Sequence, residues 1–474
     1  MRDMLTASAL AVSRSSELPA DHHGGPVHPV SGVHGVLQLS QRLAGDDQHV
    51  PVVQNVALAN KHIHDVETGP TSMLDIASLV TPDDGSVTIE EAFVSALQRR
   101  KPLAAERYLL AALSQLSPDQ VLECILTVAI PRAALDEHHF NYVVFTARTL
   151  DEIGWQWAPV LLRPPVRYVA SHPALYGAYG FPDDYVDEIL RNWRDFSSLE
   201  GLIDEFRLLQ IDLRHATGAD ETTSVGELAG CIGSPENVAR IPRLLAEALA
   251  GGLSLEGAGE ALSVGAAQLF LRCGYASPDE VHMHTAINAR RYLLKRENLG
   301  LRTKLLALLS WNRDPEVHFA NTEIRCVPEY MRFSPGADEA TLARLPKLDQ
   351  DELLNAIEDA IRSHPEIPAS QARKGIQSLI SWPKIRHTLA LAEQYAVLGY
   401  DPAAFFARVG VLACEDEFSE MHGYKFQQAA YEEYHATRPD YRWFHLVSVV
   451  KHVACIFGIR PKPIYEKVVA TRAA

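Results

Sequence analysis

Hydrophobic residues recur at steps of three and four along most of the chain beyond residue 86, with polar residues between them. This spacing places the apolar side chains on one face of an α-helix. Runs of roughly 12 to 18 residues with this pattern alternate with short polar breaks, a usual length for helices of globular proteins. The clearest predicted helices span residues 87–99, 104–116, 118–129 and 140–153.

Local start signals precede several of these runs. A serine or threonine followed three residues later by glutamate or glutamine can cap a helix, because each side chain accepts a hydrogen bond from a free backbone N–H of the first turn. Proline directly after the cap suits the first helical position. Such signals occur at Thr88-x-x-Glu91, Ser117-Pro118-x-Gln120 and Ser277-Pro278-x-Glu280.

Alternating strand patterns bounded by Asn-Gly or Asp-Gly turns are almost missing, so the pattern predicts an all-α fold with little or no β-structure. We expect an irregular array of antiparallel helices, arranged as helical hairpins or as a bundle. No fixed repeat period selects a named solenoid. Residues 1–20, rich in Ser and Ala, are predicted to be a disordered leader, and residues 21–474 a single large helical domain. Two predicted loops, 333–346 and 363–370, divide it into a long first part and a C-terminal helical part.

Composition narrows the classes of protein. Of the 474 residues, 47% are hydrophobic and 22% charged, as in a globular protein with a large core. The net charge of −16 would repel a phosphate backbone, which argues against a nucleic-acid partner. No apolar run is long enough for a membrane span, and no convincing signal peptide is present, so we expect a cytoplasmic protein. The six cysteines lack any CxxC pair, which indicates reduced core thiols.

Histidine is the residue type that points to chemistry. Seven of the 20 histidines precede residue 65, four of them in the stretch DHHGGPVHPVSGVH, and others fall on predicted helices far along the chain. Imidazole suits iron, zinc, copper or nickel, and a metal site in a helical protein takes side chains from several helices. The pairs Asp136-x-x-His139 and Asp279-x-x-His282 each place a carboxylate and an imidazole on one helical face.

A further segment, 414–435, is predicted to form one long helix. Glu415, His422, Lys425, Ala429 and Glu432 would then follow a single stripe. A buried lysine favours its neutral amine, which can react with carbon dioxide to form a carbamate, an anionic oxygen ligand for iron. The plainer interpretation is a surface lysine paired with a glutamate.

Three features together resemble the questin-oxidase-like family, helical oxygenases that act on aromatic polyketides. They are His28 and His34 before an apolar helix, the segment VHMHTAINARRYLL from Val281, and MHGYKF from Met421. The family includes members that bind non-haem iron through histidines of separate helices and a carboxylated lysine. The resemblance implies that Lys425 is the counterpart of that lysine and has a catalytic role as a ligand. The metal ligands that it implies are His28 or His34, His139, His282, His422 and Lys425.

The leading hypothesis is therefore an Fe(II)-dependent oxygenase that uses dioxygen as a co-substrate on an aromatic small molecule in an apolar cavity. Both ring cleavage and oxygen insertion remain open. Two alternatives are a carboxylate-bridged di-iron bundle, for which only Glu432-x-x-His435 has the strict spacing, and a helical interaction scaffold without catalysis. Convergence of the histidines favours an enzyme, and dispersal favours a scaffold. The candidates for lining the cavity are Trp155, Trp157, Tyr168, Tyr176 and Trp443.

Overall fold

All regular structure in the described part of the chain is helical. The computed structural model describes residues 1–13, 27–65, 87–132, 138–171, 196–218, 220–272, 282–313, 317, 321, 324–325, 335–363, 382–415, 421–458 and 462–472. No strand occurs within these ranges. The predicted all-α class is confirmed.

The first group of helices packs around one hydrophobic core and includes the N-terminal third of the chain. Its buried side chains come mainly from α1 to α9, with additions from α15, α24 and the segments beside them. Two 3₁₀-helices, Gly45–His49 and Trp155–Trp157, connect members of the group. Its helices are α1 (Arg2–Val12), α2 (His28–Arg42), α3 (Val50–Ile63), α4 (Ile89–Gln98), α5 (Pro102–Gln115), α6 (Pro118–Arg132), α7 (His138–Ile153), α8 (Ala158–Leu161) and α9 (Arg163–Ser171).

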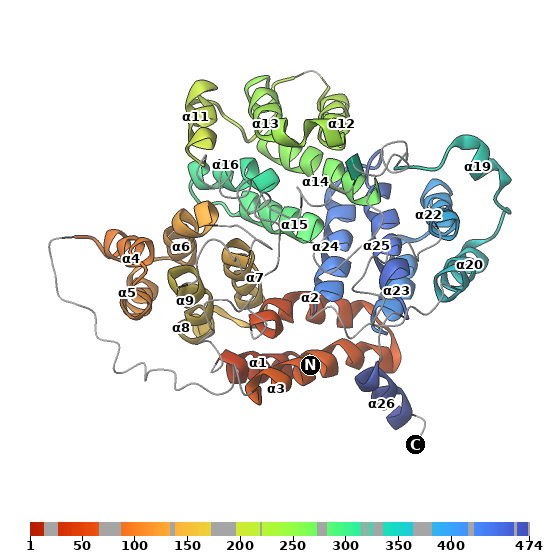
Figure 1. The fold of residues 1–474 in the computed structure, drawn as a ribbon, viewed down its shortest axis with the longest axis horizontal. Coiled ribbons are helices and arrows are strands. Elements are labelled where there is room, and N and C mark those ends of the chain that lie inside the picture. The colour runs from red at the N-terminus through yellow and green to blue at the C-terminus, as the bar shows by residue number, and fades with distance from the viewer. Residues whose placement is uncertain are drawn as a thin grey trace.

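The second group surrounds a separate core, and α26 (Pro463–Arg472) packs back on α3. Helices α15 and α24 contribute buried residues to both cores, so they form the seam between them. Figure 1 shows α2, α7, α15 and α24 near the centre of the molecule. The helices of this group are α11 (Ser197–Glu205), α12 (Glu221–Ile232), α13 (Ile241–Ala250), α14 (Leu255–Arg272), α15 (His282–Lys295), α16 (Leu301–Leu309), α19 (Glu339–Arg344), α20 (Gln350–Arg362), α22 (Trp382–Val397), α23 (Pro402–Ala413), α24 (His422–Ala436) and α25 (Trp443–Ile456).

The helices predicted from apolar spacing correspond to α4, α5, α6 and α7. The capping box at α4 is present: the Glu91 backbone N–H donates to Thr88 Oγ1, and the Thr88 N–H donates to the Glu91 carboxylate. At α6, the Ser117 N–H donates to Gln120 Oε1 at 3.0 Å. The signal at residues 277–280 lies outside the described residues. Local capping therefore explains where these helices begin.

The predicted disordered leader is wrong for its first part. Residues 2–12 form α1, which packs against α2 and α3. Leu5, Ala9 and Val12 fall on one face of this helix and are buried. Three apolar side chains at helical spacing are enough to anchor a segment whose composition is otherwise rich in Ser and Ala. Residues 14–20 lie outside the described residues.

The predicted long helix at 414–435 is also wrong. Helix α23 ends at Ala413 with Cys414 as its C-cap, and α24 begins at His422. Its N-cap, Met421, has a φ of +70°, a left-handed conformation that does not continue a right-handed helix. Glu415 consequently leaves the predicted stripe and forms ion pairs with Arg362 and Lys462.

The predicted division near residues 333–370 does not separate two cores. Residues 339–344, inside the predicted loop 333–346, form the short helix α19, and α20 (350–362) lies between the two predicted loops. Most of 363–370 lies outside the described residues. Trp311, Leu353 and Tyr395 belong to the same hydrophobic core on both sides of this region. The change from the first core to the second occurs between α9 and α11.

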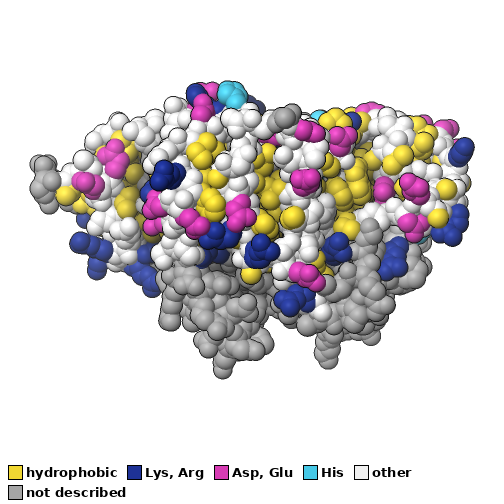
Figure 2. Space-filling model, turned by 90° about the horizontal axis from the view of Figure 1, so that it is seen from above, with side chains coloured by type: hydrophobic (Ala, Val, Ile, Leu, Met, Phe, Trp, Pro, Cys, Tyr) yellow, Lys and Arg dark blue, Asp and Glu magenta, His cyan; other side chains and the backbone are white. Residues whose placement is uncertain are grey.

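Two features of the described residues relate to the expected absence of nucleic-acid and membrane partners: the charge of the surface and the character of the helices. On the face drawn in Figure 2, lysine and arginine side chains are interspersed with aspartate and glutamate. Among the described helices, none combines the length and the apolar character needed to cross a membrane.

Candidate metal centre

Four buried histidines lie at the first described residue of four different helices. They are His28 on α2, His138 on α7, His282 on α15 and His422 on α24. These histidines are far apart in the sequence, and the first core supplies two of their helices while the seam supplies the other two. We refer to them as the histidine cluster.

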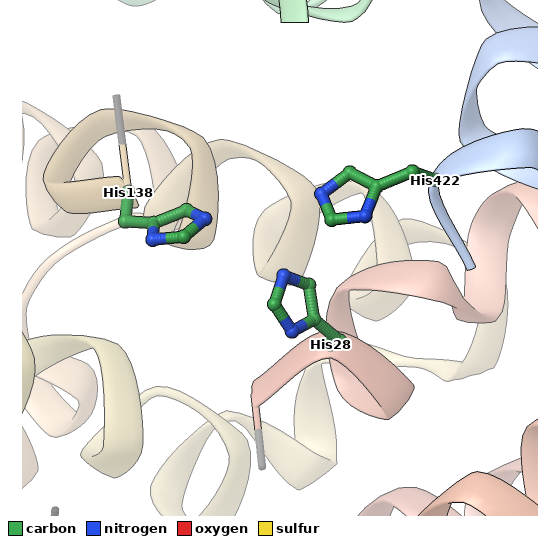
Figure 3. Close-up of side chains that lie close together, drawn as sticks. All are labelled: His28, His138 and His422. Atoms are coloured by element: carbon green, nitrogen blue, oxygen red, sulfur yellow. The ribbon is translucent and has the colours of Figure 1, made fainter. Parts of the chain in front are cut away.

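Three members of the cluster form a tight group. One ring nitrogen each of His28, His138 and His422 lies within 4.8 Å of the other two. Figure 3 shows the three imidazoles facing a common centre from three separate helices. Within the described ranges, this is the one group of histidine, cysteine or carboxylate side chains with such spacing. Ligand nitrogens about 2.1 Å from a metal ion lie up to about 4.2 Å apart, so small side-chain shifts would complete the coordination.

His282 is the fourth ring beside this group. Its centroid lies 4.7 Å from that of His422 and 5.7 Å from that of His138. The centroid separations are 4.8 Å for His28 and His422 and 5.5 Å for His28 and His138, so the four rings form a closed circuit. Imidazoles on one metal ion place their centroids about 4.5–5.5 Å apart. Three of the four separations fall within this range and that of His138 and His282 lies just above it, so the cluster is close to the size of a four-histidine metal site, with His282 outside the tightest group.

Two glycines allow α2 to approach α24 closely enough to bring His28 to His422. A Cβ atom on Gly32 would lie 3.0 Å from Cβ of Met421. A Cβ atom on Gly35 would lie 3.1 Å from the backbone oxygen of Tyr424 and 3.3 Å from Cα of Lys425. Because Gly35 faces backbone atoms, the neighbouring helix would have to move to accept a side chain there.

Aromatic rings form one side of the cluster. The Tyr142 ring is stacked on His138 with centroids 4.8 Å apart and planes 5° apart, and its edge faces His28. Tyr168, one of the predicted lining residues, packs edge-on against Tyr142 at 5.1 Å. Of the other predicted lining residues, Trp155 donates a hydrogen bond to Asp151, and Trp443 is stacked on Phe444. Tyr176 lies outside the described residues.

His138 occupies the place that the sequence suggested for His139. Consecutive residues on a helix point about 100° apart, so only one member of this pair can face the cluster. His139 is buried with its ring 4.8 Å from that of Tyr168 and is not part of the group. The spacing Asp136-x-x-His139 favoured the wrong member of the pair, and Asp136 lies outside the described residues. The four-residue step from His138 to Tyr142 is the local signal that was missed.

His28 rather than His34 belongs to the cluster. His34 lies on α2 with Nδ1 3.0 Å from a Glu152 oxygen and Nε2 2.9 Å from a Glu432 oxygen. Lys425 is buried one turn after His422, and its Nζ lies 5.5 Å from the centroid of the Phe145 ring. Lys425 therefore follows His422 by about one helical turn, and its role as a ligand stays a prediction.

A second group of buried histidines, here called the core histidines, comprises His284 on α15 with His445 and His452 on α25. The ring of Phe426 lies 4.9 Å from His284 and 4.6 Å from His452. Burial lowers the pKa of His445 to about 4 and that of His452 to about 3. These rings pack as neutral core residues and do not form a metal-binding group within the described ranges.

A pocket of about 580 Å³ opens elsewhere on the four helices of the histidine cluster, and its lining includes His34, Arg148, Asn288 and Glu432. Burial alone would raise the pKa of Glu432, but the Arg148 guanidinium and His34 outweigh it and hold this pKa well below its usual value. Because Glu432 already binds Arg148 and His34, the predicted Glu432-x-x-His435 motif does not present a free carboxylate for a di-iron site.

Comparison of the chain with protein-family models, with curated proteins and with solved structures finds no match.

Proposed function

We propose that this protein is a metal-dependent oxygenase. In this proposal His28, His138, His282 and His422 bind one ferrous ion, and dioxygen is the co-substrate for oxidation of an aromatic small molecule. The ion, when bound, would supply binding and activation of dioxygen. The four histidines hold it, and the buried Tyr142 and Tyr168 exclude water from one side.

The observation that carries the proposal is the convergence of four imidazoles from four helices. Burial alone does not indicate a metal, because the core histidines are also buried; the ring nitrogens of His28, His138 and His422 that lie close together are what supports the proposal. The donor set is composed of imidazoles, which suit iron, copper, zinc and nickel. The choice of iron and of an aromatic substrate rests on the resemblance to the questin-oxidase-like family.

Carboxylation of Lys425 is a separate part of the proposal. The neutral amine would add to carbon dioxide and lose a proton, which gives a carbamate near the cluster. The position of Lys425, buried and one turn after His422, supports it. Protein prepared with ¹³C-bicarbonate should show a carbamate carbon signal that is lost in Lys425→Ala. A signal that persists in this variant would exclude Lys425.

The first experiment is elemental analysis of protein purified without a metal-affinity column, in an anaerobic, iron-supplied preparation. We expect about one iron per chain, lost in His282→Ala and in His422→Ala. His435→Ala is the matched control, because His435 lies on the same helix as His422 but binds the Tyr431 carbonyl at the surface. A wild-type protein without metal under these conditions would contradict the proposal. Oxygen consumption with aromatic phenols and quinones then tests the activity.

A further inference from the structure

The four helices that carry the histidine cluster meet again at a second set of polar contacts. His34 lies on α2, Arg148 and Glu152 on α7, Asn288 on α15, and Glu432 on α24. We call these five residues the polar belt. Each helix that supplies a cluster histidine therefore also supplies at least one belt residue.

His34 joins three of these helices. Its Nδ1 donates to Glu152 Oε1 at 3.0 Å. Its Nε2 lies 2.9 Å from Glu432 Oε1 and 2.7 Å from Arg148 Nη2. A protonated Nε2 can donate to Glu432, and an unprotonated one can accept from Arg148, so either state of His34 finds a partner. With Nε2 protonated, His34 links α2 to both α7 and α24; with Nε2 unprotonated, both of its partners lie on α7, and the link to α24 runs through the Arg148–Glu432 pair.

Glu432 connects the remaining helix. Arg148 Nη2 donates to both oxygens of Glu432, at 2.6 and 2.5 Å, and Arg148 Nη1 donates to Asn288 Oδ1. The Asn288 amide in turn donates to Glu432 Oε2 at 2.9 Å. Charge-assisted hydrogen bonds of this kind are directional and stronger than neutral ones. The belt consequently restrains both the rotation and the axial position of α7, α15 and α24.

The belt is close enough to the histidines for a stiff helix to carry a displacement from one to the other. Along their helices, His34 and Asn288 follow the cluster histidine by six residues, and Arg148 and Glu432 follow it by ten. These steps correspond to about 9 and about 15 Å of helix. A ligand set needs to be held to within about 0.5 Å, so a small slide or rotation of one helix would spread the imidazoles.

We propose that the polar belt is a positioning device for the metal centre, in which His34 and its partners set the register of the four helices and hence the spacing of the imidazoles. This inference rests on the proposed function, because it requires that the cluster binds a metal. His34 is a positioning residue and not a ligand. The proposal also explains why these helices keep a polar network between them where apolar packing would suffice for stability.

The test compares binding of Co²⁺ and Fe²⁺ by wild type, His34→Ala and His34→Gln in the full-length protein. We expect His34→Ala to weaken the metal Kd about tenfold, the size of a remote coupling effect. Stoichiometry and the visible spectrum of the saturated Co²⁺ protein should stay unchanged, because the ligands are the same. His34→Gln should recover part of the affinity, since its amide can donate to one carboxylate. Arg243→Ala, which breaks an exposed pair with Glu205, is the control.

Each outcome supports or contradicts one part of the proposal. An unchanged Kd in His34→Ala contradicts the belt, and so does a changed spectrum at saturation, which would make His34 a ligand. If His34→Ala does not fold, Glu152→Gln removes the charge at nearly constant volume and should give the same weakening. A wild-type protein that binds neither ion contradicts the proposed function itself, whereas wild-type binding with equal Kd in all belt variants contradicts the belt alone.

Discussion

Two groups of buried histidines share helix α15, yet only one of them has the geometry of a metal site. His282 belongs to the histidine cluster, and His284, two residues later, belongs to the core histidines. In the cluster, the rings of His28, His138 and His422 face one another. Among the core histidines, the phenyl ring of Phe426 lies beside both His284 and His452. Burial of histidine is therefore not a sign of metal binding; convergence of the ring nitrogens is.

The largest expected effect is the loss of metal affinity when a histidine of the cluster is removed. His28→Ala removes one of four donors. Since the binding free energy of a structural zinc site is about 10–16 kcal/mol, loss of a quarter of it, about 2.5–4 kcal/mol, would weaken the Kd by roughly 70- to 900-fold. His452→Phe should leave the Kd unchanged, because that ring belongs to the core histidines. Titration calorimetry with Co²⁺ measures both variants. Equal losses in the two would mean that the two groups act as one site.

The next effect is a loss of folding stability at acidic pH. The folded-state pKa of His445 is about 4, below the usual 6.5, because burial disfavours the charged ring. Below pH 6.5 the unfolded chain therefore binds more protons than the folded one, and the free energy of unfolding falls as the pH drops towards 4. The shift corresponds to about 3 kcal/mol from His445. Stability at higher pH is unaffected by this group.

Urea unfolding of metal-free protein between pH 7 and pH 4 measures this loss. His452→Phe should make the loss smaller, because His452 has the same direction of shift and the phenyl ring cannot be protonated. At pH 7 this variant should be as stable as wild type or more so, since it also removes two buried ring nitrogens that lack a hydrogen-bond partner among the described residues. A variant with the wild-type acid slope would show that His452 is not one of the groups responsible.

A smaller loss of metal affinity is expected when a residue that packs on the histidine cluster is changed. Tyr142→Leu removes the ring stacked on His138, so the imidazole loses a neighbour that fixes its plane. We expect about a tenfold weaker Kd, typical for a residue that orients a ligand. Tyr142→Phe keeps the stack and should bind as wild type does. If Tyr142→Phe is as weak as Tyr142→Leu, the hydroxyl rather than the stacking is what matters.

A final test separates metal binding from folding. A ligand that binds only the folded state raises the free energy of unfolding by about 2.7 kcal/mol at a concentration of 100 times its Kd. Metal should therefore raise the Tm of wild type and of His452→Phe, but not that of His28→Ala. A rise in His28→Ala as large as in wild type would place the binding site elsewhere.

Much of the fold was determined by the sequence at short range. Apolar residues at three- and four-residue steps and the Thr88–Glu91 capping box predicted α4 to α7, since such signals act within one helix and need no distant partner. The abundance of histidine likewise pointed to metal chemistry. Where local signals were weak, the prediction was wrong: Ser- and Ala-rich composition hid α1, and the left-handed Met421 was not foreseen within 414–435.

Only the tertiary structure decided which histidines meet. His138 and His139 are adjacent in sequence but point about 100° apart, so the packing of α7 selects one of them. His28 reaches His422 because Gly32 and Gly35 let α2 approach α24, and His34 turns to carboxylates of α7 and α24 instead. These outcomes depend on contacts between residues that are hundreds of positions apart, and helix periodicity carries no information about such contacts.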